Sequence, residues 1–171
     1  MLLGRNAIEQ ALAAGHIICD PAPATIEAVH IDLHLGRHFW LALPHYGDGL
    51  GAVRLADADP GALYAPGCAE VSIIIPAHGL VLAHTQERAG STVPWLCPFI
   101  ETRSALARWG IAVHLSAGWG DPGYCGRWTL EIYNHRPQTV AIPVGARVCS
   151  IGFHRVEGND ALYTARYNPA E

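Results

Sequence analysis

The sequence predicts a mainly β fold, a barrel or sandwich, with one short N-terminal helix and one internal helix. Half of the 171 residues are apolar and 15% are charged, which is the composition of a well-buried globular chain. Eighteen Gly and twelve Pro are spread along the chain and divide it into short segments. Short apolar runs recur between these turn signals. We expect a single domain over residues 1–171.

The first third of the chain contains one helix and one clear strand. Residues 5–14 carry apolar residues four apart, and Gly15 stands where a helix is expected to end. Residues 28–36 alternate apolar and polar side chains, the period of a half-buried strand. Residues 44–70 are rich in Gly, Pro, Asp and Ala, so we expect a long irregular connection or an active-site flap.

The rest of the chain is predicted to be strands interrupted by one helix. Residues 102–109 favour a helix, because Ala and Leu dominate and Ser104 and Arg108 lie four apart. The expected strands are 71–75, 79–85, 95–100, 111–116, 127–134, 139–143 and 147–154.

Charge and cysteine usage exclude several classes of protein. The net charge is −4 and the basic residues are scattered, so we expect no nucleic-acid partner. All eleven basic residues are Arg, which excludes lysine Schiff-base chemistry. The five cysteines form no C-x-x-C pair, and neither a leader nor a membrane span is evident. We therefore expect reduced thiols in a cytoplasmic protein without a membrane partner.

Glu131 is the strongest candidate for a catalytic group. It stands alone in the apolar run W-T-L-E-I-Y, where a buried carboxylate is costly unless a partner meets it. Burial also raises the pKa of a carboxylate toward the range in which it can transfer protons. The alternative interpretation is a structural ion pair, for example with Arg108.

The candidate metal-binding and serine-hydrolase motifs are weaker. His30, His34 and His38 recur every four residues, but the surrounding alternation favours a strand, and neither H-E-x-x-H nor the zinc-deaminase signature occurs. We therefore expect no protein-bound metal. No G-x-S-x-G elbow occurs for a serine hydrolase. The helical segment with Arg103, Ser104 and Arg108 instead offers two guanidinium groups and a hydroxyl, which suit the recognition of an anion or a planar ligand.

In combination and order, these segments resemble the dCTP deaminase family of the dUTPase-like superfamily. The matching stretches are T-R-S-A-L-A-R-W-G (102–110), H-L-S-A-G-W-G-D-P-G-Y-C-G (114–126) and T-L-E-I-Y-N (129–134). The strands I-D-L-H-L-G (31–36) and P-V-G-A-R-V-C-S-I-G-F (143–153) also match. The resemblance implies a dUTPase-like distorted β-barrel or jelly-roll.

The resemblance implies a metal-free hydrolytic deamination of a cytosine deoxynucleotide, dCTP by default. Glu131 would activate a water and protonate the departing amine, with Ser104 and Arg108 holding the reacting groups in line. The substrate-binding residues would be Arg103, Ala105, His114, Ala117, Asp121, Tyr124, Thr129, Leu130, Tyr163 and Arg166. The family forms homotrimers with active sites between subunits, and it uses Mg²⁺ bound through the nucleotide phosphates.

Two departures from the family pattern lie where the phosphates are expected. Ala105 replaces a second Ser, and the C-terminal tail is shortened, with Tyr163 and Arg166 as remnants of the family's lid. The phosphate number and the modification of the cytosine therefore stay open. A dUTP diphosphatase, a bifunctional deaminase and diphosphatase, and a non-catalytic trimeric nucleotide-binding protein are the alternative functions.

Overall fold

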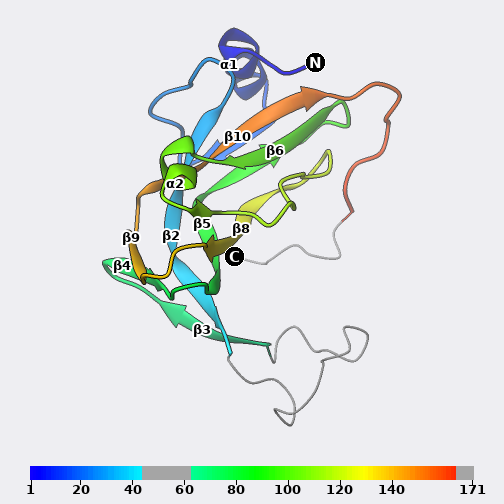
Figure 1. Ribbon diagram of the computed structural model, residues 1–171. Helices are drawn as coiled ribbons and strands as arrows, with labels where there is room; N and C mark the ends of the chain where they lie inside the picture. The colour runs from blue at the N-terminus through cyan, green and yellow to red at the C-terminus, as the bar shows by residue number, and fades with distance from the viewer. Residues whose placement is uncertain (44–62, 165–171) are drawn as a thin grey trace.

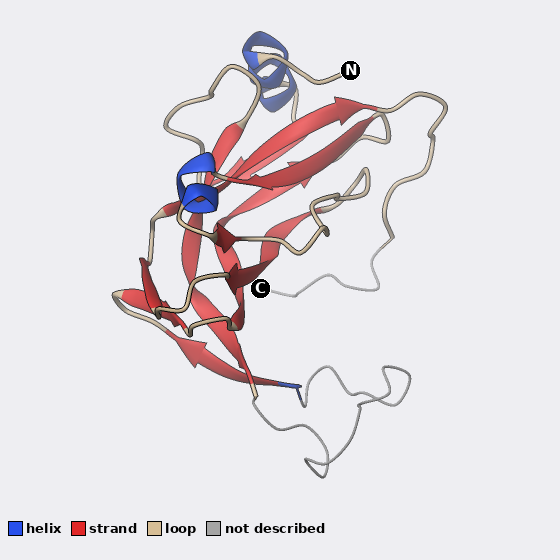
Figure 2. Ribbon diagram, in the orientation of Figure 1, coloured by secondary structure: helices blue, strands red, loops and turns tan. Residues whose placement is uncertain are grey.

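The computed structural model describes residues 1–43 and 63–164, which form a mainly β molecule (Figures 1 and 2). The two helices of this part are α1 (Arg5–Ala13) and α2 (Ser104–Arg108). The strands are β1 (Ile17–Asp20), β2 (Ile31–Ala42), β3 (Tyr64–Cys68), β4 (Ser72–Ile75), β5 (Leu80–Ser91), β6 (Leu96–Thr102), β7 (Ile111–Ala112), β8 (Cys125–Asn134), β9 (Val140–Pro143) and β10 (Arg147–Arg155).

The predicted fold class and both predicted helices are confirmed. Helix α1 ends beside Gly15, which adopts φ +72 as expected of a helix-terminating glycine. Two predicted segments were wrong. The irregular connection 44–70 contains strand β3, which forms because it pairs with the far end of β2; residues 44–62 lie outside the described part. The strand expected over 111–116 is only β7, because the chain bends after Ala112 and its backbone no longer pairs with β8.

Eight strands form one strongly bent sheet in the order β6-β10-β2-β5-β8-β7, with β1 added to β5 and β3 added to β2. Strand β2 changes partners along its length: its first half pairs with β10 and its second half pairs with β3 and β5. This change of partner curls the sheet toward a barrel, as Figure 1 shows. Strands β4 and β9 form a separate two-stranded sheet.

The core lies inside the bend and is built from the alternating apolar residues of the strands. Leu130 and Ile132 of β8 and Phe153 of β10 are among its fully buried side chains. Because successive side chains of a strand point to opposite faces, the residues between them point outward. No helix in the described part of the chain is long and apolar enough to cross a membrane.

A buried asparagine fixes the end of strand β8. The Asn134 side chain is fully buried, and its Nδ2 donates to the carbonyls of Ile75, Pro76 and Gln138. Its Oδ1 accepts from the backbone N–H of Arg136. Four backbone groups, two at and just after the end of β4 and two after β8, therefore depend on one side chain.

Replacing Asn134 with Ala is expected to lower the free energy of unfolding by about 2–4 kcal/mol, because buried backbone groups lose their partner. Chemical denaturation measures this loss. The matched control is Asn159→Ala, since Asn159 makes the same kinds of contact in a half-buried loop. An equal, small effect of both substitutions would contradict the role given to Asn134.

Candidate active site

Glu131 lies on the outer face of the sheet, between core residues that point inward. Leu130 and Ile132 are fully buried, whereas Glu131 is half-buried. The sequence predicted a buried carboxylate, and that prediction was wrong: the alternation that buries its neighbours turns Glu131 outward. Its cross-strand partner is Leu82, and the adjacent outward pair is Thr129 with His84.

One oxygen of the Glu131 carboxylate is held by the backbone. The N–H of Leu115 donates to Oε2 over 2.8 Å. No ion pair involves Glu131 within the described residues, so the alternative interpretation of a pair with Arg108 finds no support there. The carboxylate is therefore positioned, while its other oxygen has no protein partner in the described structure.

The loop that supplies Leu115 is anchored to β6. Thr102 Oγ1 accepts from the N–H of Val113, and the N–H of Ile100 donates to the carbonyl of Gly118 over 2.7 Å. A Cβ at Gly118 would lie 2.6 Å from the Ile100 carbonyl oxygen, so only glycine allows this close approach. The loop is thereby held at a fixed distance from Glu131.

His114 and Ala117 lie in this loop as the sequence places them. His114 is half-buried, with Nε2 3.5 Å from Glu101 Oε2, and its buried Nδ1 has no partner in the described structure. Ala117 is exposed. Both positions are within a few residues of the backbone group that holds the Glu131 carboxylate.

Asp121, Pro122 and Gly123 form a turn that leads directly into β8. The N–H of Tyr124 donates to the Asp121 carbonyl over 2.9 Å, and Gly123 has φ +94. Proline followed by a glycine with positive φ is the pattern of a type II turn. Asp121 is exposed at this turn.

The tail packs against the same turn. The N–H of Tyr163 donates to the Pro122 carbonyl over 2.7 Å, and its ring meets that of Tyr124 edge to face at 5.9 Å. Burial, with a smaller contribution from Tyr163, raises the pKa of Tyr124. Its hydroxyl donates to the Arg127 carbonyl over 3.1 Å. The structure thus brings Tyr163 and Tyr124 together, while Arg166 lies outside the described residues.

Helix α2 presents its polar side chains to the surface. Ser104, Ala105 and Arg108 are all exposed. No hydrogen bond or ion pair in the described part of the chain joins them to Glu131, although α2 packs beside β7 at the edge of the same sheet (Figure 1). Within the described residues of one chain, the two parts of the predicted catalytic set are therefore not bonded to each other.

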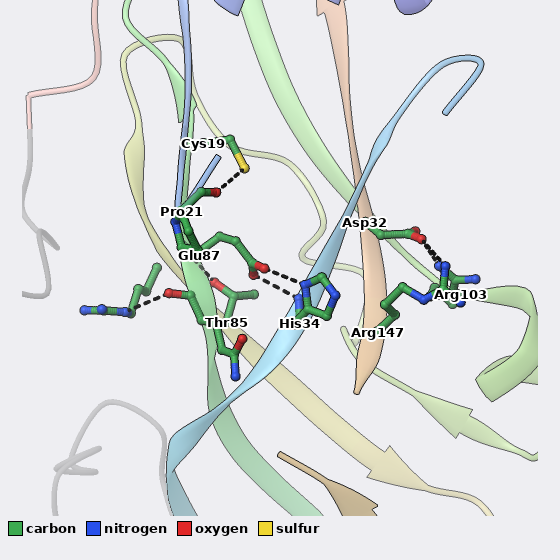
Figure 3. A network of polar contacts seen from close by, with 10 residues as sticks. Cys19, Pro21, Asp32, His34, Thr85, Glu87, Arg103 and Arg147 are labelled. Carbon is green, nitrogen blue, oxygen red and sulfur yellow. Dashed lines mark hydrogen bonds and ion pairs between the residues drawn. The ribbon is translucent and has the colours of Figure 1, made fainter. Parts of the chain in front are cut away.

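Arg103, which precedes α2, is engaged by a carboxylate that the sequence analysis did not single out. Asp32 forms an ion pair with Arg103, lies 3.3 Å from Nη1 of Arg147, and accepts from the Ser150 hydroxyl over 3.2 Å. Figure 3 shows Asp32 of β2 beside the guanidinium groups of Arg103, which follows β6, and of Arg147 on β10. Asp32 therefore fixes the start of α2. An isolated carboxylate in the alternating strand I-D-L-H-L was the available signal.

A second carboxylate, Glu87, is buried and contacts the half-buried His34. Glu87 is 5% exposed, its Oε1 lies 2.5 Å from His34 Nδ1, and its Oε2 accepts from the His34 N–H over 2.9 Å. Figure 3 shows both contacts. This pair links β2 to β5, so His34 has a structural role. No group of three or more metal-ligating side chains occurs among residues 1–43 and 63–164.

Two predicted ligand contacts lie on opposite faces of β8. Thr129 is exposed on the same face as Glu131. The side chain of Leu130 lies in the core because the strand alternates, so a ligand on the outer face can meet Leu130 only through its backbone.

Comparisons with known proteins converge on one family. A family model described as dCTP deaminase-like matches residues 2–156. A curated relative from Cytophaga hutchinsonii, named dCTP deaminase, dUMP-forming, is 38% identical over 53% of this chain and 54% of its own length. A relative of the same name from Hathewaya histolytica is 37% identical over 54% of this chain and 56% of its own length. The chain thus spans about half the length of these relatives in the matched regions.

A solved structure confirms the predicted fold. The crystal structure of a 2'-deoxycytidine 5'-triphosphate deaminase from Agrobacterium tumefaciens superposes with a TM-score of 0.62. The match covers 89% of this chain and 46% of that one at 18% identity. At this identity the similarity establishes the fold.

Proposed function

The chain belongs to the dCTP deaminase-like family, and on that premise we propose that it hydrolyses the 4-amino group of a cytosine deoxynucleotide, dCTP by default. The observation that carries the proposal is the position of Glu131. It is a single carboxylate on an open sheet face, with one oxygen held by a backbone N–H and the other without a protein partner in the described structure. A general base needs this combination of fixed geometry and a free oxygen.

Glu131 first accepts a proton from water and later donates a proton to the leaving amine. The carboxylate accepts a proton from water as the water oxygen bonds to C4 of the base. It then delivers a proton to the amine, the C4–N bond breaks, and ammonia leaves. The products are ammonia and the corresponding uracil nucleotide. The contact with the Leu115 N–H keeps the carboxylate aligned through both transfers.

Ser104 and Arg108 of a neighbouring subunit complete the site in a homotrimer. Two observations support this arrangement. Both side chains are exposed on α2, and no hydrogen bond or ion pair joins them to Glu131 within the described part of one chain. A guanidinium and a hydroxyl placed against the outer face would supply the fixed donors that stabilise charge on the base in the transition state. Arg103, oriented by Asp32, stands beside them.

The remaining predicted contacts surround the start of β8. Asp121 is assigned to the deoxyribose, and Ala117 and His114 to the base. Tyr124 and Tyr163 form one edge-to-face pair beside the turn, so they are assigned to the sugar side of the site. Mg²⁺ enters bound to the nucleotide phosphates, the ligands that this ion prefers. We place the reaction in the cytoplasm, in keeping with the five free cysteines.

A second hydrolysis, of dUTP to dUMP and diphosphate, is also proposed. The curated relatives that carry the name dCTP deaminase, dUMP-forming favour it over release of dUTP. In this step water attacks the α-phosphorus, the bond to the β-phosphate oxygen breaks, and diphosphate leaves.

A substrate panel tests the proposal. Purified protein with Mg²⁺ is incubated with dCTP, dCDP, dCMP, CTP and dUTP, and both ammonia and nucleotide products are measured. We expect ammonia release from dCTP with dUMP as the final nucleotide. Turnover of dUTP alone indicates a diphosphatase. Binding of nucleotides without any turnover indicates a non-catalytic nucleotide-binding protein and contradicts the proposal.

A further inference from the structure

The outer sheet face that carries Glu131 continues into a groove of about 960 Å³. Strands β2, β3, β5 and β8 line it. Its described lining contains five basic side chains and no acidic one; the basic residues are Arg37, His38, His84, Arg88 and Arg127. Pockets of this size accommodate ligands as large as a nucleotide.

Two of the arginines are cross-strand neighbours in the sheet, and Nε of Arg127 donates to the Gln86 carbonyl over 3.3 Å. Arg88 of β5 and Arg127 of β8 are register partners and both are exposed. Facing residues of an antiparallel pair have Cβ atoms about 5 Å apart, and like charges at this distance repel. Arg37 is paired with Glu70, but no ion pair to Arg88 or Arg127 occurs within the described residues. An anion between them would remove the repulsion.

The groove extends from the arginines toward Glu131 past His84, a neutral side chain. Burial, then the charges of Arg127 and His38, lower the pKa of His84 below its usual value. His84 also contacts the Trp40 ring, with centroids 4.6 Å apart. It is the register partner of Thr129, two residues from Glu131 on the same face. The groove therefore begins beside the catalytic carboxylate and runs to the arginine pair.

The length of this path matches a nucleotide. Four residues of β8 separate Glu131 from Arg127, which is about 13 Å at the usual rise of a strand. This is comparable to the distance from the base of an extended nucleoside triphosphate to its outer phosphates. The turn carrying Asp121, the residue assigned to the sugar, leads into β8 at the Arg127 end.

We propose that Arg88 and Arg127 bind the polyphosphate chain of the substrate whose base lies at Glu131. This inference rests on the deamination proposed above. Guanidinium groups form strong charge-assisted hydrogen bonds with phosphate oxygens. The pair supplies phosphate contacts at a distance from α2, where Ala105 offers no hydroxyl.

The test compares Arg88→Gln/Arg127→Gln with the charge-matched control Arg5→Gln/Arg155→Gln, whose residues lie outside the groove lining. Inorganic tripolyphosphate, titrated calorimetrically at fixed ionic strength, is expected to bind the wild type and the control equally and the groove variant about 10- to 100-fold more weakly. This measurement needs no turnover, so it tests polyphosphate binding in the groove even if no nucleotide is deaminated.

Kinetics give the second measurement. The groove substitutions are expected to raise KM for dCTP about 10- to 100-fold, with kcat preserved and less effect on KM for dCMP. Unchanged tripolyphosphate affinity, or equal changes in KM for dCTP and dCMP, would overturn the inference while leaving the deaminase proposal intact. Loss of the oligomer in size-exclusion chromatography with retained tripolyphosphate binding would overturn it too, because the arginines would then be subunit contacts.

Discussion

Replacing Glu131 with Gln is expected to lower kcat for cytosine deamination by about 10²- to 10⁴-fold, the usual contribution of a positioned general base. The carboxamide keeps an oxygen that can accept from the Leu115 N–H, so the loop should remain in place. It cannot accept the proton of the attacking water. Ammonia release under saturating dCTP measures the effect.

The control for this substitution is Glu157→Gln, which removes one exposed carboxylate from a bend that follows β10. Its rate should equal that of the wild type. Both variants should unfold at the wild-type temperature and keep the wild-type oligomeric state. A Glu131→Gln protein with an undiminished rate would remove Glu131 from the reaction.

Replacing Arg108 with Ala is expected to reduce kcat by about 10²- to 10³-fold, the cost of losing one fixed donor to developing charge. Stability should change by less than about 0.5 kcal/mol, because Arg108 is exposed and forms no ion pair within the described residues. Activity and thermal unfolding, measured on the same preparation, separate these two effects.

Arg5→Ala is the matched control, since Arg5 is also an exposed helical arginine. It should leave both kcat and stability unchanged. Loss of activity accompanied by an equal loss of folded protein in Arg108→Ala would show a structural role and contradict the catalytic assignment.

Local patterns predicted most of the strands and both helices. The alternation around Glu131 and the Pro-Gly pair at 122–123 are local signals, and the structure follows them. Strand β3 was missed because its residues are poor strand formers and it exists through pairing with β2. The exposure of Glu131 was also misjudged, although strict alternation with Leu130 and Ile132 contained that information.

Contacts between segments that are far apart in the chain could not be predicted from the sequence. Asp32 meets Arg103 across 71 positions, and nothing near either residue specifies the other. Arg88 and Arg127 face each other only because register shifts in β5 between His84 and Arg88. The likeness to a family located the candidate catalytic residues, but the basic groove became evident only with the sheet in place.

Mixing two inactive variants tests whether Glu131 of one subunit works with Arg108 of another. Glu131→Gln and Arg108→Ala proteins are unfolded together, refolded at equal concentration and assayed with dCTP. Random assembly around a cyclic interface places an intact Glu131 beside an intact Arg108 at about a quarter of the sites. We therefore expect recovery of about a quarter of the wild-type rate. A mixture that stays as inactive as its two components would contradict the shared active site.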